Sequence, residues 1–219
     1  DLIFYNICKM KKIKSIIFDL GEVLLNISYQ NTINEFEKLG IENSSSFYSK
    51  KLQNNMFNLL ETGKISEDEF VSKIQKSCTN STEKEIIFAW NKMLLNLPEN
   101  RISLLKKLKS EYNIYLLSNT NSIHIKEFEK RLGKEKYSEF YNLFDKVYYS
   151  HQIGHRKPNA KAFQLIIEEN NLNSDEILFI DDSPQHIEGA KKLGINCYHL
   201  KDGENVISLF PDIVLSELH

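Results

Sequence analysis

Four short runs of mostly apolar residues, each followed closely by polar residues, constrain the fold of this chain more than any other feature. Apolar side chains cluster in these runs without clean alternation, which is typical of strands that are covered on both faces. The runs are Ile13–Phe18, Ile114–Leu117, Lys146–Tyr149 and Ile177–Ile180, and Asn196–Leu200 is a fifth candidate. The pattern therefore predicts a buried sheet of parallel strands.

Helical patterns separate these strands. Pro98 stands at the first turn of one amphipathic stretch, and Asn159 is a candidate N-cap of another. The last helical stretch is followed by Gly194, a residue type that is common just beyond helix ends. Strands that alternate with helices indicate a doubly wound α/β fold with a Rossmann-like parallel sheet.

The segment 27–97 differs from the rest because it carries helical patterns and no convincing strand. Ser66 with Glu69, and Thr82 with Glu85, fit the capping box that begins many helices. We expect an α/β core formed by residues 10–26 and 98–219, a helical cap formed by residues 27–97, and an N-terminal extension of residues 1–9. An insertion after the first strand lies over the carboxyl ends of the strands, where open α/β sheets bind ligands.

Polar groups with distinct chemistry follow the predicted strands. They are Asp19 after the first strand, Ser118 and Asn119 after the second, Lys157 beyond the third, and Asp181 and Asp182 after the fourth. Alone, each would be interpreted as a turn or capping residue. If the strands are parallel neighbours, however, their carboxyl ends bring all these groups to one crevice.

This combination of side chains suits phosphoryl transfer. A carboxylate can attack phosphorus and form an aspartyl phosphate. Clustered carboxylates repel one another, and a hard cation such as Mg²⁺ relieves the repulsion while it bridges to phosphate. A hydroxyl, backbone amides and an ammonium group can then hold the phosphate oxygens and offset charge in the transition state.

The four strand-end segments resemble the four motifs of haloacid dehalogenase superfamily phosphatases, and they extend from Phe18 to Gly194. The resemblance implies that Asp19 is the nucleophile and that Ser118 binds phosphate with help from the backbone near Asn119. It implies that Lys157 steadies the nucleophile and the phosphate. It also implies a Mg²⁺ site formed by Asp181, Asp182, the Asp19 side chain and the Gly21 backbone carbonyl.

The helical insertion resembles the class-one cap of the same superfamily, which closes over small substrates. The motif wording is similar to that of glucose-1-phosphate phosphatases and of the phosphatase domain of soluble epoxide hydrolase. The resemblance therefore implies a Mg²⁺-dependent phosphatase for small phosphate esters, sugar phosphates among them. Its partner would be a small phosphorylated metabolite.

The chain departs from the family pattern at Gly21. Most phosphatases of this superfamily carry a second aspartate there, which serves as general acid and base. A glycine still offers its backbone carbonyl to a cation, but it offers no proton to the leaving group. Glu22 is a candidate proton donor, and a solvent-facing or cap-facing role is the alternative for this residue.

Two other functions remain open at this point. A dehalogenase of the same superfamily would use Asp19 to attack carbon and would need no metal, but the adjacent pair Asp181 and Asp182 favours a cation. A non-catalytic phosphate-binding or interaction protein is the second alternative, with Gly21 as the mark of lost turnover.

Composition narrows the class of partner. A formal net charge of -2 gives no electrostatic reason to expect nucleic acid or an anionic membrane as partner. Cys8, Cys78 and Cys197 form no CxxC pair, which favours a reducing, cytoplasmic location. Four histidines fall near the predicted crevice loops, and we expect surface or capping roles for them; they are His124, His151, His155 and His186.

Overall fold

The centre of the molecule is a five-stranded parallel sheet. The computed structural model describes residues 12–41, 55–78 and 80–211, so the expected extension 1–9 lies outside the described residues. The strands are β1 (Ser15–Phe18), β2 (Asn113–Ser118), β3 (Lys146–Tyr149), β4 (Ile177–Asp181) and β5 (Asn196–His199). They lie in the order β3-β2-β1-β4-β5, and every neighbouring pair is parallel. The expected fold class is confirmed, and the predicted strands differ from the observed ones only at their ends.

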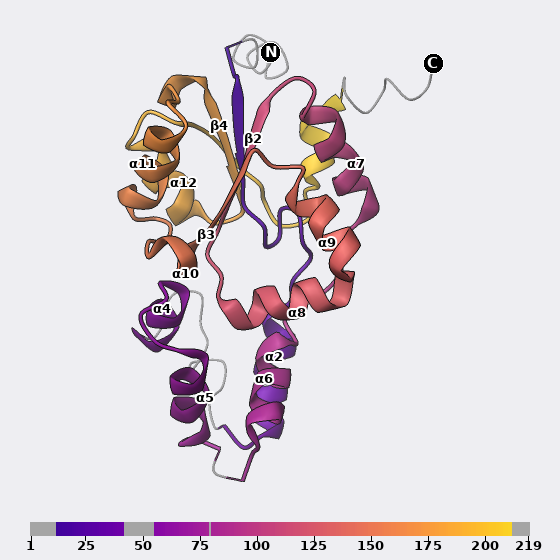
Figure 1. The fold of residues 1–219 in the computed structure, drawn as a ribbon, viewed down its shortest axis with the longest axis vertical. Helices are drawn as coiled ribbons and strands as arrows, with labels where there is room; N and C mark the ends of the chain where they lie inside the picture. Colours follow the sequence, from indigo (N-terminus) through magenta and orange to yellow (C-terminus); the bar gives the residue numbers. More distant parts are fainter. Residues whose placement is uncertain (1–11, 42–54, 79, 212–219) are drawn as a thin grey trace.

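Helices cover both faces of the sheet. They are α7 (Glu99–Leu108), α8 (Ser122–Leu132), α9 (Lys134–Tyr141), α10 (Ser150–Ile153), α11 (Ala160–Glu169) and α12 (Pro184–Lys191), with the short 3-10 helices η1 (Ser174–Glu176) and η2 (Val206–Leu209). Figure 1 shows α11 and α12 on one side of the sheet and α7 and α9 on the other. Strand residues alternate between the two faces, because Ile17 packs in the core beneath α11 whereas Ile16 and Phe18 pack in the core beneath α7. Both faces are therefore apolar, which explains the continuous apolar runs in the sequence.

The strand order places the ends of β1 and β4 next to each other. The chain passes from β1 to β2 and β3 on one side and then returns to β4 and β5 on the other. Phe18 is in register with Ile180, and the Asp19 N–H donates to the Ile180 carbonyl oxygen at 3.0 Å. Asp19 and Asp181 consequently leave the sheet side by side at its topological switch point, where open α/β sheets bind ligands.

The segment between β1 and α7 forms a group of helices beyond the carboxyl ends of the strands. Its helices are α2 (Tyr29–Lys38), α4 (Asn55–Glu61), α5 (Glu67–Gln75) and α6 (Glu83–Asn91). Figure 1 shows these helices extending from the end of the sheet where α8 and α10 lie. We call residues 27–97 the helical insertion.

Local signals set the helix starts in the insertion, and aromatic rings fill its centre. Both predicted capping boxes are present, at the start of α5 and of α6. The fully buried Trp90 ring lies 5.2 Å from the ring of Phe57 and 5.1 Å from that of Phe70. Aromatic pairs at this spacing contribute roughly 0.5–1.5 kcal/mol beyond the area they bury.

Two chain crossings connect the insertion to the core. The Asn26 N–H donates to the Asn96 carbonyl at 3.0 Å, and the Leu95 N–H donates to the Asn26 carbonyl at 3.0 Å. Ile27 and Leu94 form an antiparallel bridge beside them. The two chain segments that connect the helical insertion to the core are therefore hydrogen-bonded to each other.

His124 forms a third connection and is buried, contrary to the expected surface or capping role. Its ring stacks on Trp90 with centroids 4.7 Å apart, and Nε2 lies 3.1 Å from the Trp90 carbonyl oxygen. The Asn121 side chain accepts from the His124 N–H, so its Nδ2 donates to His124 Nδ1 at 3.1 Å. This network assigns the proton to Nε2 and leaves the ring neutral. Burial lowers the pKa of His124 to about 4, although the hydrogen bond to Trp90 opposes the shift.

We predict that His124 makes the protein lose stability as the pH falls from about 6.5 to about 4. The folded state resists protonation of His124, whereas the unfolded chain takes up the proton near pH 6.5. His124→Gln removes this penalty and keeps a hydrogen-bond donor for Trp90. The free energy of unfolding of the variant, relative to wild type, should rise by about 3 kcal/mol between pH 7 and pH 4. Urea denaturation at several pH values measures this difference.

The matched control is His155→Gln, which changes a histidine in the loop after β3. It should keep the pH dependence of the wild type. A constant difference between His124→Gln and wild type across this pH range would contradict the neutral assignment of the ring.

Candidate active site

A cavity of about 110 Å³ lies at the carboxyl ends of the strands, between the sheet and the helical insertion. Residues from three strand ends line it, and so do residues of the insertion and of the loop before α11. The lining includes Asp19, Gly21, Tyr29, Glu61, Ser118, Asn119, Thr120, Arg156, Asp182, Gln185 and His186. The structure thus brings together most of the residues that the sequence predicted.

The ammonium group of Lys157 lies beneath this cavity and is shared by two carboxylates. Its Nζ is 2.8 Å from Asp19 Oδ1 and 2.6 Å from Asp181 Oδ2, and the side chain is 0% exposed. Burial lowers the pKa of Lys157, but the charges of Asp181 and Asp19 outweigh burial and the pKa ends above its usual value. Lys157 is therefore a permanent positive charge at the floor of the site.

Asn119 holds the backbone of Lys157 in place. Its Oδ1 accepts from the Lys157 N–H at 2.9 Å, and its Nδ2 donates to the Lys157 carbonyl oxygen at 2.9 Å. The sequence pointed to Asn119 for its backbone, as an aid to phosphate binding. The structure adds a role for its side chain, which connects the end of β2 to the loop that carries the lysine.

Asp19 carries an electrostatic strain that Lys157 relieves only in part. Burial raises the pKa of Asp19 well above its usual value, Lys157 opposes this, and the charges of Asp181 and Asp182 raise the pKa further. The Leu20 N–H donates to Asp19 Oδ1 at 2.7 Å, so this contact and that of Lys157 both end on the same oxygen. The surroundings of Asp19 therefore disfavour its ionised form relative to that of an exposed aspartate.

Asp181 is buried and held by several donors at once. In addition to Lys157, the Ser183 N–H donates to its Oδ1 at 2.8 Å and His186 Nδ1 lies 3.0 Å from the same oxygen. Burial raises the pKa of Asp181, but Lys157 and His186 lower it by more, so the pKa ends below its usual value. Asp181 is thus a fixed negative charge that positions Lys157.

Asp182 faces the cavity, unlike its neighbour. It lines the cavity together with Asp19 and Gly21, and its charge acts on both Asp19 and Tyr29. The two neighbouring aspartates therefore have different surroundings: Asp181 contacts Lys157, whereas Asp182 lines the cavity.

The residues present fit a divalent cation. Lys157 pairs with two carboxylates, Asp19 and Asp181, and the charge of a third, Asp182, also acts on Asp19, which leaves an excess of negative charge at the edge of the cavity. Carboxylate and carbonyl oxygens are the ligands that Mg²⁺ prefers. Ligand atoms of Asp19, Asp181 and His186 also lie within 4.8 Å of one another, although Asp181 is already occupied by Lys157 and His186.

Of the remaining predicted residues, Ser118 and Gly21 line the cavity and Glu22 does not. Ser118 is buried at the end of β2 and lines the cavity. Gly21 also lines it, and a Cβ at this position would come within 3.1 Å of the Ile27 side chain. Glu22 is not among the lining residues; it adopts a left-handed φ of 61° and its N–H donates to the Leu25 carbonyl.

The sequence did not point to several polar residues of the cavity, among them Tyr29, Glu61 and Arg156. Tyr29 and Glu61 come from the insertion, and Arg156 directly precedes Lys157. Proximity to Lys157 was an available signal for Arg156. Tyr29 and Glu61 belong to no motif, and only the folded arrangement of the insertion places them at the site.

Comparison with known proteins places this geometry in a family. A D-ribitol-5-phosphate phosphatase of Bacteroides thetaiotaomicron is 30% identical over 192 residues, which cover 87% of this chain and 93% of that protein. A HAD family enzyme from the same species, solved as an aspartate-to-alanine variant with magnesium and inorganic phosphate, is 33% identical with a TM-score of 0.83. The match covers 90% of this chain and 98% of that structure.

A HAD-like family hydrolase from Porphyromonas gingivalis has a similar structure. It is 28% identical with a TM-score of 0.80, and the match covers 93% of this chain and 98% of that structure. The family model of haloacid dehalogenase-like hydrolases matches residues 16–200, a span that includes all of the sheet except Ser15 at the start of β1 and every residue of the site described above. The chain therefore belongs to the haloacid dehalogenase-like hydrolase family.

Proposed function

We propose that this protein is a Mg²⁺-dependent phosphatase that hydrolyses small phosphate monoesters through a phosphorylated Asp19. The observation that carries the proposal is the buried ammonium of Lys157 between Asp19 and Asp181, at the floor of a cavity that Asp182 and Ser118 also line. The relative that acts on D-ribitol 5-phosphate and the similar structure with magnesium and phosphate support this reaction class.

In the proposed reaction, Asp19 forms and then releases a covalent bond to phosphorus. A carboxylate oxygen of Asp19 attacks the phosphorus atom, the bond from phosphorus to the alcohol oxygen breaks, and this oxygen takes up a proton from solvent water as the alcohol leaves. Water then attacks the same phosphorus atom, which frees Asp19 and inorganic phosphate. Splitting the reaction in this way replaces one difficult displacement by two easier ones.

Lys157 and Ser118 would serve both steps. Lys157 is fixed by the side chain of Asn119 and by Asp181, so its charge needs no rearrangement to face a phosphate on Asp19. The Ser118 hydroxyl reaches the cavity from the neighbouring strand. Preorganised groups of this kind stabilise transition-state charge, and removing one typically costs about 10²–10³-fold in turnover.

Asp19, Asp182 and the Gly21 carbonyl are the residues that would hold Mg²⁺ in this proposal, with Asp181 behind them as the partner of Lys157. A bound Mg²⁺ supplies positive charge that favours ionised Asp19 and offsets the charge of the phosphoryl group.

We also propose that residues 27–97 act as a cap over a core formed by residues 10–26 and 98–219. The side chains of Tyr29 and Glu61 support this role because they reach the cavity from the insertion.

Among the described helices, none is long and apolar enough to span a membrane. The expected reducing, cytoplasmic location is part of this proposal and rests on the sequence, in which the cysteines form no CxxC pair.

The dehalogenase alternative fits this site less well. Attack on carbon needs no cation, whereas the carboxylates here outnumber the ammonium group and Asp182 faces the cavity beside Asp19. The non-catalytic alternative does not explain the raised pKa of Asp19, because a pKa shifted in this way is typical of groups that react.

We predict that Asp19→Asn abolishes turnover and raises the stability of the metal-free protein. Loss of the nucleophile should lower phosphate release by about 10³-fold or more. The pKa of Asp19 is raised in the folded state, so its ionisation destabilises the protein at any pH above the usual carboxyl range. The gain in thermal midpoint should therefore be small near pH 4 and grow as the pH rises to 7.

Asp68→Asn on the exposed surface of α5 is the matched control and should change neither property. An Asp19→Asn variant that still turns over substrate at the wild-type rate would exclude Asp19 as the nucleophile.

We predict that Mg²⁺ raises the thermal midpoint of the wild type as well as its phosphatase activity. A ligand that binds only the folded state at 100 times its dissociation constant adds about 2.7 kcal/mol of stability. Asp182→Asn should weaken both effects, whereas Asp202→Asn in the exposed loop after β5 should keep them. Undiminished hydrolysis of phosphate esters after EDTA treatment would show that the metal assignment is wrong.

A further inference from the structure

A second buried ion pair lies in the cavity, between the helical insertion and the core. Glu61 ends α4, and Arg156 lies in the loop that carries Lys157. Arg156 Nε is 2.9 Å from Glu61 Oε2, and the two side chains are only 18% and 9% exposed. Arg156 also donates a hydrogen bond from Nη1 to Asn58 Oδ1, one turn earlier in α4.

The two facing atoms of this pair are not satisfied by each other. Among the described residues, neither Glu61 Oε2 nor Arg156 Nε has a hydrogen-bond partner of suitable geometry, although both atoms are buried. Burial raises the pKa of Glu61, and the charges of Arg156 and Lys157 offset this only in part. A buried ion pair whose facing atoms lack a well-formed hydrogen bond is weak support for folding stability. Its position in the cavity offers a different explanation.

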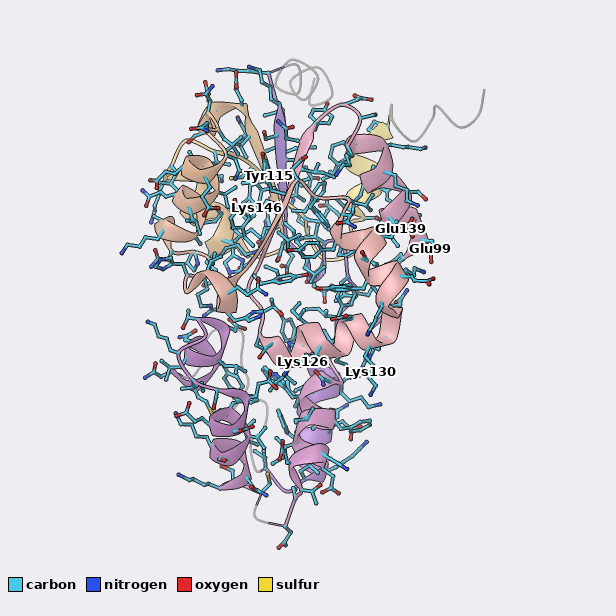
Figure 2. All side chains as sticks on the ribbon, in the orientation of Figure 1. Glu99, Tyr115, Lys126, Lys130, Glu139 and Lys146 are labelled. Carbon is cyan, nitrogen blue, oxygen red and sulfur yellow. The ribbon has the colours of Figure 1, made fainter. Side chains whose placement is uncertain are left out.

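The helical insertion also contacts the core through an exposed ion pair, so docking of the insertion does not by itself require a buried ion pair in the cavity. Lys126 of α8 pairs with Glu67 of α5 at 2.7 Å, and both side chains reach solvent. Figure 2 shows Lys126 where α8 meets the helices of the insertion. Glu67 and Lys126 are absent from the cavity lining, whereas Glu61 and Arg156 belong to it together with Asp19.

The charges of the pair indicate which kind of group it would bind. A second anionic group on a substrate would be repelled by Glu61, and an ammonium group would be repelled by Arg156. A hydroxyl is neutral, donates to the carboxylate and accepts from the guanidinium. Tyr29 and Gln185 add further polar side chains to the same cavity. Glu61 and Asp19 line the same cavity, so a hydroxyl that reaches Glu61 would belong to the alcohol part of an ester bound at Asp19.

We propose that Glu61, paired with Arg156, selects phosphate esters whose alcohol part carries hydroxyl groups, and that Glu61 accepts a hydrogen bond from one of them. The inference rests on the proposed phosphatase function and adds to it the class of leaving group and the residue that recognises it. A site with a buried acceptor rejects a substrate that lacks the matching donor, because its own polar atoms are then left unpaired.

The test compares two esters of equal chain length, a pentitol 5-phosphate and pentyl phosphate, with Mg²⁺ present. The measured quantity is the ratio of kcat/KM for the pentitol ester to kcat/KM for the pentyl ester. The wild type should favour the pentitol ester, and Glu61→Gln should lower the ratio by about tenfold, the difference between a charged and a neutral hydrogen-bond acceptor. Glu61→Ala should lower it by at least as much, and thermal unfolding checks that each variant is folded.

Glu67→Gln is the matched control, because it removes an ion pair between insertion and core outside the cavity. It should keep the wild-type ratio. If Glu67→Gln lowered the ratio as strongly as Glu61→Gln does, the effect would come from docking of the insertion and the inference would be overturned.

The remaining outcomes separate this inference from the function on which it rests. A wild type that hydrolyses both esters, with a ratio that Glu61→Gln leaves unchanged, would overturn the inference alone. A wild type that hydrolyses neither ester nor nitrophenyl phosphate would overturn the proposed function and the inference together.

Discussion

The shared ammonium group of Lys157 is the interaction on which the rest of the site depends. Without it, Asp19 and Asp181 would be two carboxylates side by side at the ends of β1 and β4 with little water to separate their charges. Lys157 satisfies Asp181, with help from His186, and leaves Asp19 only partly compensated. A cation bound beside Asp19 would supply the missing positive charge, which connects the proposed Mg²⁺ site to the proposed role of Asp19 as nucleophile.

The order of the strands in the sheet brings the two carboxylates and the lysine together. Because β1 and β4 are adjacent and parallel, Asp19 directly after β1 and Asp181 at the end of β4 lie side by side. The lysine comes from beyond β3 and needs a separate anchor, which the side chain of Asn119 supplies. Tyr29 and Glu61 of the helical insertion line the cavity, while Trp90 and His124 connect the aromatic centre of the insertion to α8.

Sequence patterns predicted the parts of this structure that depend on neighbours along the chain. The strands, both capping boxes and the groups at the strand ends follow from local periodicity and turn chemistry. Three features were not predictable in this way, because each depends on contacts between distant segments. They are the hydrogen bonds of the Asn119 side chain to the backbone of Lys157, the neutral ring of His124 and the Glu61–Arg156 pair. Arg156 and Asn58, for example, are 98 positions apart. Glu22 stays a candidate proton donor: it is not among the residues that line the cavity, but its charge acts on Tyr29, which is one of them.

The central claim is that Asp19 carries the phosphoryl group during turnover. The most direct measurement is mass spectrometry of the protein quenched in acid during turnover, followed by digestion. The account predicts that the peptide containing Asp19 gains the mass of one phosphoryl group, that hydroxylamine removes it, and that Asp19→Asn protein never shows it. Rapid turnover with no phosphorylated Asp19 at any quench time, or a phosphoryl group on another residue, would contradict the account.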